Sequence, residues 1–152
     1  TLQLKRNVYG GGGIMPDIFV PLDTTFYTEY YNKIGNRGVI NKVVIQYIDQ
    51  NRAVLKKKYP KFEKFNASFQ TNDEVLEKLK LLAEKEKIEF NSAQFETSKP
   101  LIKLQIKALI ARDLWEMNEY YQVIDVENES LKKAIQILQT PGTYDSLLKQ
   151  TR

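Results

Sequence analysis

The sequence predicts a mainly α fold, a helical bundle preceded by a short β segment. Two observations support this: after residue 23 apolar residues recur at helical spacing in several segments, and four consecutive glycines and two prolines stand before that residue. Because no large sheet is predicted, the helices must bury their apolar faces against one another. A chain of 152 residues has the size of about one domain and can form a core without disulfides.

The first 23 residues are expected to be extended. Thr1–Tyr9 alternates in the manner of a strand that begins in mid-element, which favours a segment cut from a longer protein. Gly10–Gly13, Pro16 and Pro21 exclude a helix in this region. We expect short strands joined by the glycine-rich segment.

A first helix is predicted to end near Ile34, with Asp23, Thr24 or Thr25 as its N-cap. A turn at Gly35–Gly38 should follow. The next helix has the clearest periodicity in the chain and ends at Tyr59-Pro60. Its predicted apolar face consists of Val39, Ile40, Val43, Val44, Tyr47, Ile48, Val54 and Leu55.

An aromatic connector, residues 60–70, should contain at most a short turn of helix. Thr71 and Glu74 have the spacing of a capping box, which opens a helix that turns five residues inward. Those residues are Val75, Leu76, Leu79, Leu82 and Ala83.

Two helices are expected between residues 91 and 117. Asn91 and Ser92 can cap a short helix that ends at Thr97, and Pro100 suits the first position of a longer one. The last full helix should end at Thr140-Pro141-Gly142. Its predicted inward residues are Leu131, Ala134, Ile135 and Leu138. In all, five to seven helices are predicted.

The absence of His and Cys excludes several kinds of site from this chain alone. Disulfides, zinc fingers, Ser-His-Asp triads and His-ligated metals all need one of these residues. We predict no cofactor and no metal. No apolar run approaches the ~20 residues of a membrane-spanning helix.

A Ser-Lys dyad is the one nucleophilic arrangement that the composition allows. The serines all stand in polar turns or at helix starts, where Ser is expected as a cap, so we assign no catalytic residue. They are Ser68, Ser92, Ser98, Ser130 and Ser146. Trp115 could line a ligand pocket, but an aromatic cluster at a helix junction favours a core position.

The glycine run does not fit a phosphate loop. A P-loop needs Lys-Ser/Thr and a helix directly after the glycines, and Pro16 disfavours a helix there. Glycines that permit a close approach of the backbone are the better interpretation.

Positive charge is concentrated in the first half of the chain. Residues 1–70 carry 11 Lys/Arg against 5 Asp/Glu, whereas residues 71–152 carry 12 against 14. The densest basic stretch, with aromatic residues interleaved, is Lys56, Lys57, Lys58, Lys61 and Lys64. Such a stretch can hold single-stranded nucleic acid, but a solvated helix end with Phe62 and Phe65 turned inward is favoured.

The segment from Val8 to Pro21 resembles part of the carboxyl-terminal processing (tail-specific) serine proteases. The residues that carry the resemblance follow a strand and form a glycine run with an Ile-x-Pro-Asp sequence. They are Tyr9, Gly10, Gly11, Gly12, Gly13, Pro16 and Asp17. Leu22–Thr25, Phe62–Phe69 with Asp73-Glu74, and Ala111–Trp115 resemble the helical extension of the Bacteroidetes-type members.

The resemblance implies a periplasmic or envelope endopeptidase with a Ser nucleophile, a Lys base and a PDZ domain, all upstream of this fragment. Residues 1–23 would then be terminal strands of the protease core, and residues 24–152 a C-terminal helical domain with a structural, substrate-gating or assembly role. Its partners would be the rest of the protease and protein substrates, without nucleic acid. The alternative is a free-standing helical module that binds an acidic partner or nucleic acid through its basic half.

Overall fold

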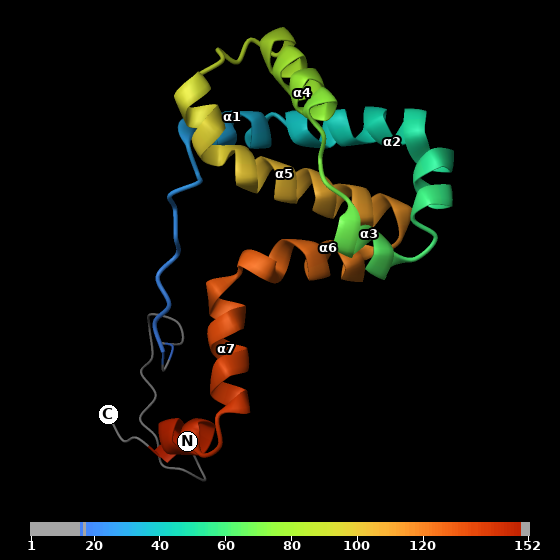
Figure 1. Ribbon diagram of the computed structural model, residues 1–152. Coiled ribbons are helices and arrows are strands. Elements are labelled where there is room, and N and C mark those ends of the chain that lie inside the picture. Colours follow the sequence, from blue (N-terminus) through green and yellow to red (C-terminus); the bar gives the residue numbers. More distant parts are fainter. Residues whose placement is uncertain (1–15, 17, 150–152) are drawn as a thin grey trace. The chain divides into compact units, whose positions relative to one another are not determined.

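A computed structural model describes residue 16 and residues 18–149 (Figure 1). This part of the chain forms eight α-helices and one short 3₁₀-helix, which confirms the mainly α fold class and exceeds the predicted five to seven helices. Residues 16 and 18–23 form no strand, and the other predicted strand residues lie outside the described part. The chain divides into two compact units, Asp23–Val126 and Thr1–Leu22 with Glu127–Arg152.

The first unit consists of six helices. They are α1 (Glu29–Asn36), α2 (Val39–Lys58), α3 (Phe62–Ser68), α4 (Asp73–Lys85), α5 (Ser92–Leu114) and α6 (Met117–Ile124). Within this unit α5 is central, with α1 and α2 on one side and α6 on the other (Figure 1). One turn of α5 is buried around its whole circumference, since the four consecutive residues Ala108–Ala111 are buried.

The apolar face predicted for α2 is largely confirmed. Its buried residues are Val39, Ile40, Val43, Val44, Ile48 and Leu55. Tyr47 is partly buried, but Val54 is wrong, because 64% of its surface is exposed. Gly38 precedes the helix at φ 66°, in the left-handed region that glycine tolerates best.

The N-cap predicted for the first helix is wrong. Asp23 accepts a hydrogen bond from the Thr25 amide, so it closes a local turn instead. The cap is Thr28, whose hydroxyl oxygen accepts from the Tyr31 amide. The same hydroxyl lies 2.7 Å from the Ser98 hydroxyl on α5, so a tertiary contact decides where this helix begins.

The predicted capping residue of α4 is also wrong, by one position. Asn72 caps the helix and accepts from the Val75 amide, whereas Thr71 is buried and donates to the Lys103 carbonyl on α5. The predicted interior face is confirmed for all but Leu82, which is partly buried.

The two helices predicted around Pro100 are one. Asn91 caps α5, as expected, and the helix then continues through Pro100 to Leu114. Side chains on both sides of the proline are buried, among them Phe95, Ser98 and Ile102. Their packing outweighs the lost backbone hydrogen bond and the steric conflict that a proline brings to a helix interior.

The second unit contains α7 (Glu129–Gln139) and α8 (Thr143–Lys149), and the 3₁₀-helix Asp125–Glu127 stands at the boundary. The predicted stop after α7 is confirmed. The predicted inward face is wrong, because Leu131, Ile135 and Leu138 are 41%, 44% and 68% exposed. None of the side chains described in this unit is buried, so its described residues form no core among themselves.

Candidate functional site

Most of the glycine motif lies outside the described residues. Of its seven residues the structure describes Pro16 alone, which is exposed. Tyr9, Gly10–Gly13 and Asp17 therefore receive no structural account, and their assignment stays a prediction.

The candidate serines are occupied by structural hydrogen bonds or stand apart from a base. Ser98 is fully buried and donates to the Phe26 carbonyl at 2.7 Å. Ser68 and Ser146 donate to backbone carbonyls one turn earlier, while Ser92 and Ser130 are exposed at helix starts. Among the residues that the structure describes, no serine hydroxyl is hydrogen-bonded to a lysine amine, and no three His, Cys, Asp or Glu residues gather as metal ligands.

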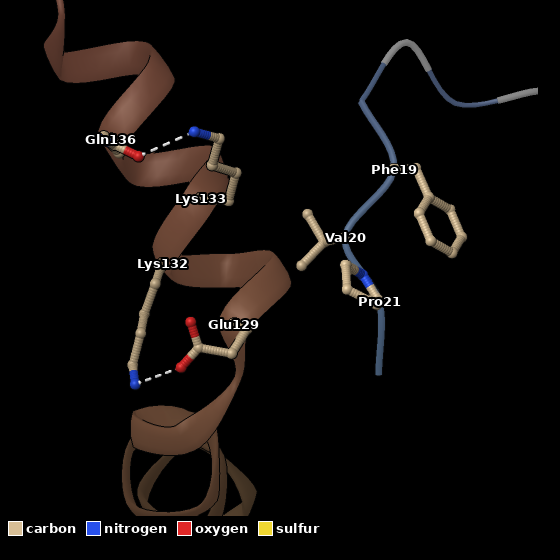
Figure 2. Close-up of a pocket in the computed structure, with 7 residues that line it drawn as sticks. All are labelled: Phe19, Val20, Pro21, Glu129, Lys132, Lys133 and Gln136. Atoms are coloured by element: carbon tan, nitrogen blue, oxygen red, sulfur yellow. Dashed lines mark hydrogen bonds and ion pairs between the residues drawn. The ribbon is translucent and has the colours of Figure 1, made fainter. Parts of the chain in front are cut away.

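A hollow of about 460 Å³ lies within the second unit, between residues 19–21 and one side of α7 (Figure 2). Val20 points toward the helix, whereas Phe19 points away from it. Lys132 forms an ion pair with Glu129 at 2.7 Å, and this hydrogen bond raises the pKa of the lysine. The hollow presents paired charges and an apolar edge, and its lining residues include no Ser, Thr, Cys or His.

The ring of Trp115 packs against the core, as its position in the sequence indicated. It meets Phe62 and Phe65 at centroid distances of 5.8 and 5.2 Å. Phe62 and Phe65 are both buried, which confirms their predicted inward orientation. Trp115 therefore joins α3 to the end of α5 and does not open into a pocket.

A second aromatic cluster joins α1, α4 and α5. Tyr30 lies edge-on to Phe90 and Phe95, and the ammonium group of Lys80 lies 4.7 Å from the centre of the Phe95 ring. Lys80 also pairs with Glu77 at 2.7 Å. The ammonium group of Lys80 thus has both an aromatic and a carboxylate partner, so we assign this cluster a structural role in holding the helices together.

Tyrosines gather where α1 meets α5 and α6. Tyr31 donates to the side-chain oxygen of Gln105 at 2.7 Å and lies edge-on to Tyr27. Burial raises the pKa of Tyr31 to about 12, with smaller effects from Tyr27 and Tyr120. Tyr27 and Tyr31 lie at α1, whereas Tyr120 lies on α6, so the fold of the chain brings these rings together. The apolar periodicity of a single helix therefore could not reveal this cluster.

Charge pairing separates two classes of lysine. Seven of the described lysines pair with a carboxylate within one helical turn or on another element of the fold: Lys33, Lys42, Lys78, Lys80, Lys99, Lys103 and Lys132. Among the described residues no carboxylate pairs with the basic patch, by which we mean Lys56, Lys57, Lys58, Lys61 and Lys64. All five side chains are exposed.

A sixth lysine lies behind the basic patch. Lys107 on α5 donates to the Asn66 carbonyl near the end of α3 at 2.6 Å. Burial lowers the pKa of Lys107. This lysine ties α3 to α5, and its charge adds to that of the exposed lysines around α3.

The described helices include none with the length and apolar character that a membrane crossing requires. No curated protein and no solved structure matches the chain. One family model does match, over residues 30–116, which is more than half of the sequence and runs from α1 to just beyond α5. The chain therefore belongs to DUF8443, a family of unknown function.

Proposed function

We propose that this chain is the non-catalytic C-terminal part of a carboxyl-terminal processing serine endopeptidase. In this proposal the Ser nucleophile and Lys base lie upstream, in the periplasm or cell envelope, together with a PDZ domain that helps to bind protein substrates. The helical unit, residues 23–126, serves as a scaffold in structure, assembly or substrate gating. The observation that carries the proposal is the glycine-Pro-Asp segment, residues 8–21, which resembles that family.

The packing of the second unit is consistent with this proposal. Phe19 lies near the end of this segment and Leu22 directly follows it, and the two are 81% and 75% exposed. Covering a large apolar side chain contributes about 1.5–3 kcal/mol, so these two residues favour contact with a further surface. The exposed apolar residues of α7 add to that surface. A catalytic core that continues the chain upstream is the partner this proposal requires.

The decisive experiment uses the parent gene. We expect the reading frame upstream of Thr1 to encode a Ser and a Lys whose replacement by Ala abolishes hydrolysis of an unfolded protein such as reduced casein. The purified 152-residue chain should hydrolyse none of it. A parent protein without such a pair would contradict the proposal, as would inhibitor-sensitive hydrolysis by the 152-residue chain itself.

The proposed contact between the exposed apolar face of α7 and the catalytic core can be tested in the parent enzyme. Leu131→Ser together with Ile135→Ser removes apolar surface that the structure leaves exposed, so it should lower the thermal stability or the peptidase activity of the parent. Ser130→Ala changes an exposed neighbour on the same helix and should leave both unchanged. If the two variants had equal thermal stability and equal peptidase activity, α7 would give no support to a contact with the catalytic core.

A further inference from the structure

The basic patch is the densest group of lysines without a carboxylate partner in the described part of the chain. Its five lysines fall within nine residues, with Glu63 as the only acidic residue in that span. Elsewhere several lysines pair with glutamate or aspartate, for example Lys33 with Glu29 at 2.7 Å, and the lysines outside the patch without such a partner, Lys85 and Lys87 among them, form no group as dense. Like charges packed this closely repel one another, so an anionic partner would relieve that repulsion.

The ammonium groups of the patch fan out around the end of α2. Successive residues of a helix differ by about 100° in direction, so Lys56, Lys57 and Lys58 cannot all face one plane. The chain then turns at Tyr59-Pro60, and Lys61 and Lys64 continue the positive charge onto α3. A flat bilayer or a straight duplex would touch only part of such a surface, whereas an extended peptide can follow it around the helix end.

The aromatic residues of this region are not available to a ligand. Tyr59, Phe62 and Phe65 are 5%, 8% and 0% exposed. Single-stranded nucleic acid is held without sequence preference by charge together with stacking of bases on aromatic rings. Here the charge is present and the stacking surface is buried, which favours a partner recognised through carboxylates.

We propose that the basic patch binds an extended, acidic protein segment rich in Asp and Glu. The affinity comes from the sum of exposed ion pairs, with Lys107 adding positive charge from behind α3. Lysine ammonium groups are point charges on long stems, so they accept carboxylates in varied geometries and need no fixed sequence in the partner. This inference does not depend on the protease proposal, since the patch lies wholly within the helical unit.

The test is a binding titration of the 152-residue chain with a fluorescent peptide of ten glutamates spaced by Gly-Ser. Lys56→Gln, Lys57→Gln and Lys58→Gln together should weaken binding about tenfold, because each exposed ion pair contributes a factor of about two. The matched control is Lys85→Gln, Lys87→Gln and Arg112→Gln, which removes the same charge from exposed positions elsewhere in the unit. It should change the affinity less than about twofold. Raising NaCl from 50 to 200 mM should weaken binding by the wild-type protein, because salt screens exposed charges.

The same titration includes a neutral Gln-Gly-Ser peptide, a single-stranded oligonucleotide, a DNA duplex and vesicles containing phosphatidylserine. Preference for the acidic peptide, lost in the patch variant and kept in the control, supports the proposal. Tighter binding to either nucleic acid or to vesicles would overturn it. Equal losses in the two triple variants would also overturn it, since net charge alone would then explain binding. So would the absence of measurable binding to the acidic peptide at 50 mM NaCl.

Discussion

The Tyr30 side chain is buried in the core although its hydroxyl group forms no hydrogen bond with the described residues. Only 2% of its surface is exposed, and its hydroxyl has no hydrogen-bond partner among the described residues. Burial raises the pKa of Tyr30, because the ionised form would lose its hydration. The ring is held by Phe90 and Phe95, so the core uses the aromatic body of the residue and gains nothing from its polar end.

Tyr30→Phe should therefore leave the free energy of unfolding unchanged or raise it by about 1 kcal/mol, since a buried hydroxyl without a partner carries a desolvation cost. Tyr31→Phe is the matched comparison and should lower that free energy by about 1 kcal/mol, because it removes the bond to Gln105. Urea unfolding of the two variants measures both effects. A loss in Tyr30→Phe as large as that in Tyr31→Phe would mean that the Tyr30 hydroxyl does have a stabilising partner.

At the scale of the helices, the sequence predicts the interior faces better than the ends. Periodicity identifies the buried face of α2 because most of its apolar positions report the same direction, and exceptions such as Ile45 and Val54 do not change it. A helix start depends on one residue. Thr71 and Asn72 are both good caps, and only the Lys103 carbonyl of α5 decides that Thr71 turns away.

Pro100 is the clearest case of tertiary packing that overrides a local signal. Pro100→Ala should raise the free energy of unfolding by about 1–2 kcal/mol, less than the ~3 kcal/mol of a helix-interior proline because the rigid proline also restricts the unfolded chain. Arg112→Ala, at an exposed position of the same helix, should change it by less than about 0.5 kcal/mol. Thermal and urea unfolding give the comparison. Destabilisation by Pro100→Ala would show that the proline sets a bend that the packing of α5 needs.

At the scale of the molecule, the two units differ in how completely they are buried. The helical unit encloses a continuous apolar core, while the side chains described in the second unit include no buried one. The amphipathic pattern of α7 predicts a helix correctly, but it cannot say what covers the apolar face. The candidate site shows the same limit: the lysines of the basic patch are plain in the sequence, yet their lack of carboxylate partners depends on the fold.

Removal of residues 127–152 should lower the free energy of unfolding of the remaining chain by less than about 1 kcal/mol, because the deleted part contributes no buried side chain that the structure describes. Ile106→Ala, at a fully buried position of α5, should by contrast cost about 2–5 kcal/mol. Hydrogen exchange of the intact chain gives an independent measurement, with the amides of α7 exchanging faster than those of α2 and α5. Slow exchange in α7 of the purified chain would contradict this division of stability.

The hydroxyl pair of Thr28 and Ser98 also has a mechanical consequence. Ser98 donates to the Phe26 carbonyl, and the Gln94 side chain accepts from the Tyr30 amide, so the backbone ahead of α1 and the first turn of α1 are each bonded to α5. Tension on the polypeptide ahead of Phe26 is thus passed to α5 through these bonds before it can unwind α1. In a single-molecule pulling experiment from that side, this fastening is the first joint to carry the load.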